Sequence, residues 1–500
     1  MKKNNLEFEK LNILIDSEKL FASFFQNQKN CFWLDSALVC EDSGRFSFLG
    51  QASQVLHYFM NGAEIHLHDF SKEKIKISVI NESLFSYLNR ELAAKKMDTH
   101  PELPFGFQCG FVGYFGYELK NECKDGNQKK NGLHSIYPDA SFFYVDRMIV
   151  LDHLEKKTYL VKLRQSNGDE SPDSWFKVCK EKISKFNSEE LKFKEFTLNK
   201  NKLEQLAKNK NSAQIVEEWI SQGKLKLKIN KNDYLQKIAH CLMKIELGES
   251  YELCLTNQAK VKSQIEPFLI YWALRNLNSA PFSAFLDFDS FAVLSSSPER
   301  FLKLDHQRQI EAKPIKGTIR RGKNKEEDQF LIEQLKESEK DQSENLMIVD
   351  LLRNDLSRVC EIGSVTVPKC MEIETFASVH QMVSTICGKL KSEFTSIDLI
   401  QASFPGGSMT GAPKKRSMDI LDELEMGARG IYSGALGYLS LTGAMDLNIV
   451  IRTLMGSSGE FTLGAGGAIT ALSDPESEFA ETLLKWKQLI LALQVAEELF

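Results

Sequence analysis

The sequence lacks an excess of charge of either sign. It holds 63 lysines and arginines against 68 aspartates and glutamates, and the formal net charge of −5 comes from signs that are mixed along the chain. A protein that binds nucleic acid or an anionic membrane through its charge needs a basic field, and none is present. We therefore expect partners that are small molecules or other proteins.

The sequence also lacks a cysteine pattern and a long apolar run. Its ten cysteines are scattered without a C-x-x-C pair, so it predicts neither a zinc site nor a disulfide framework. No uninterrupted apolar run is long enough to span a bilayer, and residues 1–10 lack the apolar core of a signal peptide. The expected location is the cytoplasm.

The composition is that of a folded globular protein, with 42% hydrophobic and 26% charged residues in a chain of 500. We predict three segments. Residues 1–165 form a β-rich N-terminal domain, because short apolar runs at 32–36, 45–50 and 110–117 alternate with turn signals. Residues 166–232 form a polar connector rich in Lys, Asn and Glu, and residues 233–500 form a second domain of mixed helices and strands.

Two segments of helical composition carry carboxylates on one face. These are Asp341 and Glu344 in the first segment, and Glu478 and Glu481 with Lys485 in the second. Hard cations such as Mg²⁺ prefer oxygen ligands, and one or two carboxylates with an anionic substrate make a typical site. Acidic pairs on a helix are more often simply solvated, so spacing alone favours the solvated interpretation over a metal site.

Two glycine-containing segments, 405–415 and 463–468, have the composition of tight turns. Ala412 stands where a P-loop has its lysine, and Ile469 stands where a dinucleotide fingerprint has its third glycine. Neither common nucleotide-binding loop is therefore present. If these segments bind anything, the backbone amides ahead of Pro413 favour a carboxylate.

Lys316 lies between Pro314 and Gly317, a setting that favours a turn. A lysine amine becomes nucleophilic where burial or a nearby cation disfavours its charged form. A lysine in a turn is usually a surface charge, so the residue by itself favours that interpretation.

Several motifs follow one another in a fixed order, mostly in the second half of the chain. They are GESYELCLT at 248–256, SSPER at 296–300, PIKGT at 314–318, ENLMIVDLLRND at 344–355, the Gly406 turn, YSGALGY at 432–438, IRT at 451–453, and the segments 464–467 and 478–485. Together they resemble the chorismate-binding enzymes, which include component I of anthranilate synthase and of aminodeoxychorismate synthase, with isochorismate and salicylate synthases. The N-terminal region matches this family less sharply, through 32–36 and GYFGYELK at 113–120.

The resemblance implies an α+β fold like that of anthranilate synthase component I, with large β-sheets stacked in a sandwich-like core and helices outside. Residues 233–500 would then be the chorismate-binding catalytic domain. In this family Lys316 separates two branches, because anthranilate synthases typically carry alanine there. Glu252 stands where the water-using relatives place a lysine base.

These two positions are similar to those of aminodeoxychorismate synthase component I, a transferase that puts an amino group on C4 of chorismate in the route to para-aminobenzoate and folate. The alternatives are anthranilate synthase component I, in tryptophan biosynthesis, and a catalytically silent chorismate-binding regulatory subunit. Retention of the implied site residues argues against the silent subunit. Whether tryptophan binds the N-terminal domain is left open by the sequence.

The resemblance also implies roles for individual residues. Glu344 and Glu481 would hold Mg²⁺, with Asp341 and Glu478 in support, although Asp341 replaces the family's usual glutamate. Substrate binding would fall to Gly317, Thr318, Tyr432, Arg452, Gly466 and Lys485.

The expected chemistry is covalent. Glu299, kept protonated, would give a proton to the departing C4 hydroxyl while neutral Lys316 attacks C2. Ammonia would then attack C4 and expel the lysine. A bound Mg²⁺ would help to keep the amine neutral.

The ammonia must come from outside this sequence. The cysteine in Gln108-Cys109-Gly110 lacks the flanking glycine of a glutaminase elbow. We therefore expect a separate glutamine amidotransferase subunit as a partner, with free ammonia as a substitute at high concentration and alkaline pH.

Overall fold

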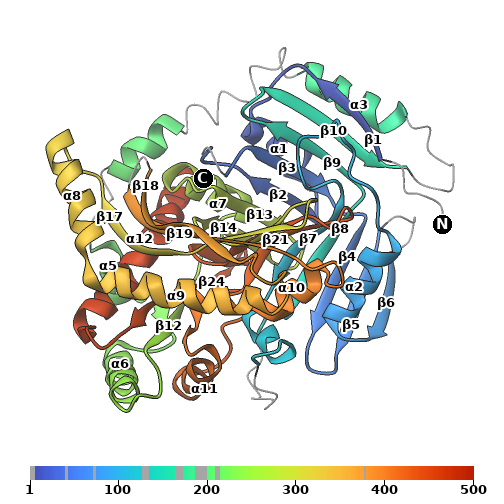
Figure 1. The fold of residues 1–500 in the computed structure, drawn as a ribbon. Coiled ribbons are helices and arrows are strands. Elements are labelled where there is room, and N and C mark those ends of the chain that lie inside the picture. Colours follow the sequence, from blue (N-terminus) through green and yellow to red (C-terminus); the bar gives the residue numbers. More distant parts are fainter. Residues whose placement is uncertain are drawn as a thin grey trace.

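The protein is described by a computed structural model, which covers residues 6–39, 43–70, 75–126, 135–164, 173–185, 200–208, 214–376 and 379–500. Within them, two antiparallel sheets of twelve strands each lie at the centre and helices surround them (Figure 1). No helix in the described part is long and apolar enough to cross a bilayer.

The first sheet runs from N-terminal strands at one end to strands that follow residue 224 at the other. Its order is β1 (Leu6–Leu11), β10 (Lys157–Leu163), β9 (Arg147–Asp152), β3 (Phe46–Gln51), β2 (Cys31–Asp35), β13 (Phe282–Asp287), β14 (Ala292–Ser297), β23 (Thr453–Ser457), β24 (Glu460–Ile469), β12 (Glu252–Val261) and β11 (Leu225–Leu227), with β20 (Gly411–Ala412) paired to β12.

The second sheet is arranged in the same way. Its order is β17 (Ile315–Arg320), β19 (Val379–Lys389), β16 (Gln309–Lys313), β15 (Arg300–Leu304), β22 (Met445–Ile449), β21 (Ala435–Ser440), β7 (Gly110–Phe115), β8 (Ala140–Val145), β4 (Gln54–Phe59), β5 (Glu64–Asp69) and β6 (Lys76–Asn81), with β18 (Thr366–Thr375) paired to β19.

The two sheets share a core because successive residues of a strand point to opposite faces. On β2, Phe32 stacks on Phe143 of β8 with ring centroids 6.3 Å apart, and both belong to the core that joins the sheets. The next residue, Trp33, points the other way into a separate core beneath the helices. The stacked arrangement with helices outside is the fold that the resemblance implied.

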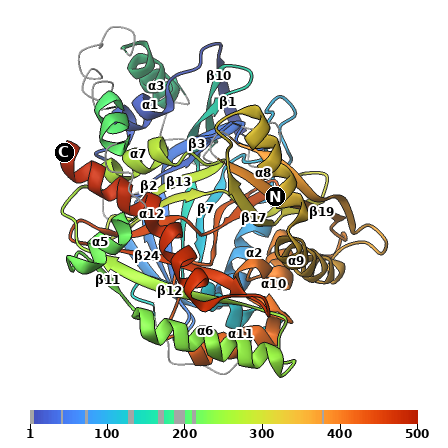
Figure 2. The same cartoon turned by 90° about the vertical axis from the view of Figure 1, so that its left-hand side faces the viewer.

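One group of helices packs on the face of the first sheet that turns away from the second. These are α1 (Ser17–Phe24), α3 (Asp173–Lys185), α5 (Ile215–Ser221), α6 (Lys231–Glu246), α7 (Pro267–Leu277), α11 (Lys414–Leu424) and α12 (Pro475–Leu499). Figure 2 shows α12 crossing this face, with α6 and α11 below it.

A second group of helices is joined to the core that contains the second sheet. These are α2 (Leu84–Ala94), α9 (Glu339–Ser357) and α10 (Ser396–Ser403), while α8 (Lys325–Glu337) lies against β17 and β19. Two short 3₁₀ helices, η1 (Tyr117–Glu122) and η2 (Gly407–Met409), are also present.

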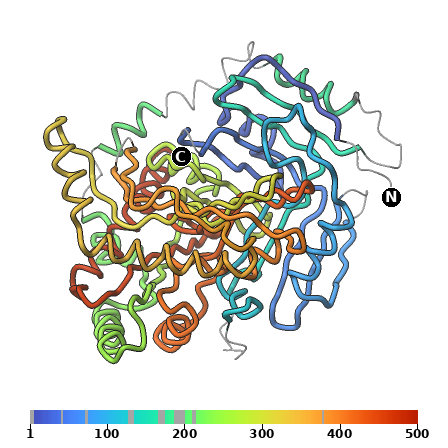
Figure 3. Tube along the Cα trace, in the orientation of Figure 1, coloured from blue at the N-terminus to red at the C-terminus, as the bar shows by residue number. Residues whose placement is uncertain are grey.

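The predicted N-terminal and catalytic segments do not have separate sheets. Strand β2 pairs with β13 in the first sheet and β7 pairs with β21 in the second, so the N-terminal segment supplies one end of both (Figure 3). The boundaries at 165 and 232 stay a prediction. Of the predicted connector, residues 166–172, 186–199 and 209–213 lie outside the described part.

Three predicted strands are present as β2, β3 and β7, but the segment 463–468 is not a turn. It lies inside β24, where a Cβ on Gly464 would stand 2.3 Å from the ring of Tyr432 and one on Gly466 would stand 2.2 Å from the Leu255 carbonyl oxygen. Glycine is needed there for close packing and not for a turn conformation.

Candidate active site

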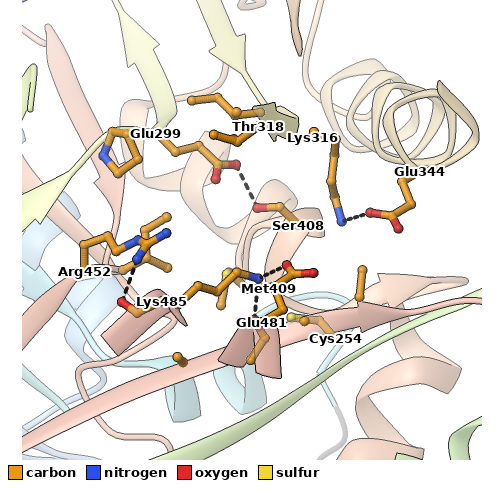
Figure 4. A pocket seen from close by; sticks show the side chains of 18 of the residues that line it. Cys254, Glu299, Lys316, Thr318, Glu344, Ser408, Met409, Arg452, Glu481 and Lys485 are labelled. Atoms are coloured by element: carbon orange, nitrogen blue, oxygen red, sulfur yellow. Dashed lines mark hydrogen bonds and ion pairs between the residues drawn. The ribbon is translucent and has the colours of Figure 1, made fainter. Parts of the chain in front are cut away.

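A cavity of about 480 Å³ lies where β12, β17 and β24 meet α9, α12 and η2. Every residue to which the sequence analysis assigned a role lines it, from Glu299 on one side to Lys485 on the other (Figure 4). The structure therefore brings the predicted residues together, and their individual roles stay predictions.

The acidic wall of the cavity comes from two helix N-termini. Asp341 and Glu344 project from the start of α9, which is capped by Ser338, and Glu478 and Glu481 project from the start of α12. Both helices and both acidic faces are as predicted, because residues three apart share a helix face. Carboxylates near a helix N-terminus are also favoured by the helix dipole.

Lys316 reaches the cavity through an irregularity in β17 and not from a turn. Ile315 pairs with Val383 and Thr318 pairs with Gln381, so two residues of β17 oppose one of β19 and form a β-bulge. Gly317 has a φ of +81°, which favours glycine, and a Cβ there would approach the side chain of Asp341 to 2.9 Å. The prediction of a turn at Lys316 is therefore wrong. Lys316 and Gly317 belong to a bulged strand at the edge of the second sheet.

The Lys316 amine is buried between two carboxylates. Its Nζ lies 2.6 Å from Glu252 Oε1 and 3.5 Å from Glu344 Oε2. Burial by itself acts to lower the pKa of Lys316, but the charges of Glu252 and Glu344 and the hydrogen bond to Glu252 raise that pKa above its ordinary value. Among the protein's own groups the balance therefore favours the ammonium, and the neutral amine expected in the presence of a bound cation stays a prediction.

Glu299 has the environment of a proton donor. It is buried in the loop between β14 and β15, and its Oε1 accepts a hydrogen bond of 2.8 Å from Ser408 Oγ. Burial raises the pKa of Glu299 to about 7, while Ser408 and Lys316 act in the opposite direction. A carboxyl with this pKa is largely protonated below neutrality, as a general acid requires.

The cavity also carries a half-buried cation, Arg452, next to α12. Arg452 donates from Nη1 to the carbonyl oxygen of Lys485 at 2.6 Å, and burial lowers the pKa of this guanidinium. Among the described residues no carboxylate forms an ion pair with Arg452, whereas Lys485 pairs with Glu481 at 2.7 Å. A guanidinium that lines the cavity and has no carboxylate partner among the described residues fits an anionic ligand, because its planar fork matches a carboxylate.

The acidic wall suits a hard cation in its donor chemistry. Within the described part, no three His, Cys, Asp or Glu side chains converge enough to hold a metal by themselves. Mg²⁺ commonly takes one or two carboxylates and completes its shell with water and substrate oxygens. Glu344 and Glu481, on facing helices of one cavity, fit that requirement and would be its ligands.

Three carboxylates of the acidic wall form ion pairs with lysines. The pairs are Glu344 with Lys316 at 3.5 Å, Glu478 with Lys340 at 2.9 Å, and Glu481 with Lys485 at 2.7 Å. Burial raises the pKa of Glu344 to about 7, with Lys316 opposing that shift. Burial also acts to raise the pKa of Glu481, but Lys485 overrides it and the net shift is downward.

Sequence reasoning missed two residues that line the cavity, Ser408 and Lys340. It also missed the ion pair that Glu252 forms with Lys316. Ser408 sits in the glycine-containing segment 405–415, which forms η2 and β20 before α11, with Pro413 as the helix cap. Lys340 directly precedes Asp341, but a lysine in an exposed helical turn gives no signal by itself. Glu252 was identified only as a departure from the water-using relatives.

The Lys316–Glu252 pair yields a stability prediction. Glu252 is fully buried and its Oε2 has no hydrogen-bond partner, so Lys316→Met leaves a buried carboxylate uncompensated. We expect the free energy of unfolding to fall by about 3–5 kcal/mol, whereas Glu252→Leu combined with Lys316→Met should recover much of this loss. Denaturant unfolding with EDTA present measures both, and a Lys316→Met protein as stable as wild type contradicts the pairing.

Comparison with known proteins agrees with the architecture and the motifs. A profile of the chorismate-binding enzymes matches residues 38–491. A protein of Streptomyces griseus named aminodeoxychorismate synthase is 42% identical over 96% of this chain and 63% of its own length. Anthranilate synthase component 1 of Acetivibrio thermocellus is 30% identical over 98% of this chain and 95% of its own length.

Solved structures show the same fold. The crystal structure of anthranilate synthase component I from Streptococcus pneumoniae superposes with a TM-score of 0.70 at 26% identity, covering 91% of this chain and 93% of that one. The chain spans between 50% and 64% of the length of four curated relatives that it matches, which are longer proteins. From its sequence match and its fold, the chain belongs to the family of chorismate-binding enzymes.

Proposed function

We propose that this chain is the chorismate-converting component of an aminodeoxychorismate synthase. It would replace the C4 hydroxyl of chorismate with an amino group to give 4-amino-4-deoxychorismate, the precursor of para-aminobenzoate in folate synthesis. The observation that carries the proposal is the Lys316 amine, which is buried in the cavity and 2.6 Å from Glu252. The 42% identity to relatives named aminodeoxychorismate synthase, against 30% to an anthranilate synthase component, supports the same choice.

Chorismate is a dianion, and the cavity offers it two unlike walls. Arg452 and the buried Tyr432, which both line the cavity, would bind the enolpyruvyl carboxylate together with the backbone at Gly466. The ring carboxylate would face Glu344 and Glu481, whose negative charge requires a bound cation between them. Mg²⁺ bound there would act as a Lewis acid on the ring carboxylate and neutralise its charge.

Lys316 must lose a proton before it can attack. Glu252 Oε1, 2.6 Å from the amine, is placed to accept this proton. The neutral amine then forms a bond to C2, both ring double bonds shift by one position, and the C4–O bond breaks. Glu299 donates its proton to the departing oxygen, so that water leaves and the lysine remains attached to the ring.

Ammonia completes the reaction. Its nitrogen bonds to C4, both ring double bonds shift back, and the C2–N bond to Lys316 breaks, which returns the lysine. The net reaction is chorismate plus ammonia to 4-amino-4-deoxychorismate plus water. Covalent catalysis of this kind divides one difficult substitution into two easier ones.

A separate glutamine amidotransferase subunit is the proposed ammonia source. Cys109 is fully buried with a φ of +63°, and burial raises the pKa of its thiol well above the ordinary value, so it does not have the environment of a glutaminase nucleophile. Cytoplasmic location is part of the same proposal.

Product analysis tests the proposal. The chain is incubated with chorismate, Mg²⁺ and ammonium salt at alkaline pH, and the products are separated and identified by mass spectrometry. We expect 4-amino-4-deoxychorismate without release of pyruvate. Fluorescent anthranilate with pyruvate as the main products would identify an anthranilate synthase instead, and binding of chorismate without turnover would identify a silent subunit.

A further inference from the structure

Lys340 is the lysine of the acidic wall that no step of the proposed reaction uses. It lies in the first turn of α9, and its Nζ is 2.9 Å from Glu478 Oε1 and 3.9 Å from Glu344 Oε1. The ammonium therefore bridges the two helices that carry the carboxylates. Glu478 is almost completely buried, and its Oε1 also accepts a hydrogen bond of 2.6 Å from Ser473 Oγ.

Without the nearby carboxylates, the position of Lys340 would be unfavourable for a lysine. A cation at a helix N-terminus is opposed by the helix dipole. The nearby carboxylates Asp341, Glu344, Glu478 and Glu481 offset that cost. Lys316 and Lys485 also face this wall, but each has a further partner, Glu252 for Lys316 and the Gly466 carbonyl oxygen for Lys485.

Lys340 also differs from Lys316 in how easily its ammonium can move from the cavity into solvent. Its side chain is 37% exposed, whereas that of Lys316 is 9% exposed. A flexible four-carbon stem at the edge of the cavity allows the ammonium to move into solvent without unfolding its surroundings.

We propose that the Lys340 ammonium is a resident counter-ion of the acidic wall that a divalent cation displaces, so that Lys340 sets how tightly the cavity binds that cation. The inference rests on the metal site of the proposed function. It explains why Glu344, Glu478 and Glu481 each contact a lysine and do not converge on one point. Entry of a doubly charged ion and exit of a singly charged one keeps the wall close to neutral.

The test is the affinity of the metal-free chain for Mn²⁺, used as the probe because electron paramagnetic resonance counts the free ion directly. Chorismate and turnover are not involved, so the result is independent of the product assay. We expect Lys340→Met to bind Mn²⁺ about fivefold or more tightly than wild type. The interaction energy of two unit charges 4 Å apart corresponds to about this change in a binding constant, even in water. Lys340→Arg, which keeps the charge, should stay close to wild type.

The matched control is Lys336→Met, which removes the same charge from an exposed position in the last turn of α8. It should leave Mn²⁺ affinity unchanged. Thermal unfolding gives a second readout. In EDTA, Lys340→Met should unfold below wild type because Glu478 loses its ion-pair partner, and saturating Mn²⁺ should raise its midpoint more than that of wild type.

A purely structural lysine predicts a different pattern. If Lys340 only holds Glu478 in place for the metal, Lys340→Met binds Mn²⁺ more weakly than wild type. Equal or weaker binding by Lys340→Met, or no measurable binding by either protein, overturns the proposal.

Discussion

Replacing Lys316 with alanine should lower kcat for ammonia-dependent amination of chorismate by about 10³-fold, the scale of losing one preorganised charged group from a catalytic site. The substitution removes both the nucleophile and the only cation within ion-pair distance of Glu252 in the described part of the chain. The loss should appear in kcat and kcat/KM together, because the covalent step occurs after chorismate is bound.

The control for this experiment is Lys313→Ala. Lys313 precedes Pro314 in the same stretch, but its ammonium pairs with Glu374, 2.9 Å away, outside the cavity. It should retain activity near that of wild type. Lys316→Ala with kcat within a few-fold of wild type would remove the lysine from the mechanism.

Glu299→Gln should reduce kcat by about 10²- to 10⁴-fold, the usual contribution of a positioned general acid. Burial raises the pKa of Glu299 to about 7, so the donating form is present below that pH and disappears as pH rises through it. The wild-type rate, expressed per concentration of free ammonia, should therefore fall above a pH of about 7. In Glu299→Gln this alkaline limb should be absent.

Ser408→Ala separates proton donation from a structural role of Glu299. The hydrogen bond from Ser408 lowers the pKa of Glu299, so its removal should raise that pKa and move the alkaline limb to higher pH. An unchanged limb in both Ser408→Ala and Glu299→Gln would assign the titration to another group.

Much of the site could be predicted because its residues lie on regular elements. The acidic faces of α9 and α12 follow from helical periodicity, which places residues three apart on one face. The same local rule cannot show that the two helices face each other across a cavity. That information came from the resemblance, and the structure supplied the geometry.

The mispredicted segments depend on contacts between residues far apart in the sequence. Glycines at 464 and 466 suggest a turn, but they are required by the Tyr432 ring and the Leu255 carbonyl oxygen that pack on β24. The charge state of Lys316 depends on Glu252, 64 positions earlier in the chain. Local sequence rules for turns and for lysine charge do not include contacts with residues that are distant in the sequence.

The domain organisation shows the same limit. Alternating apolar residues predicted the strands at 32–36 and 110–117, which are β2 and β7. Their neighbours in the sheets, β13 and β21, come from the second half of the chain. Strand existence is a local property, whereas strand pairing at this separation is set by packing of the whole core.

A bond between Lys316 and the substrate would change the mass of the intact protein. The chain is mixed with chorismate and Mg²⁺ without ammonia, quenched in acid and measured by mass spectrometry. We expect a species heavier by chorismate less one water, located on the peptide that contains Lys316 and absent from Lys316→Ala. A wild-type protein that aminates chorismate at full rate when ammonia is added, yet never shows this species, would contradict it.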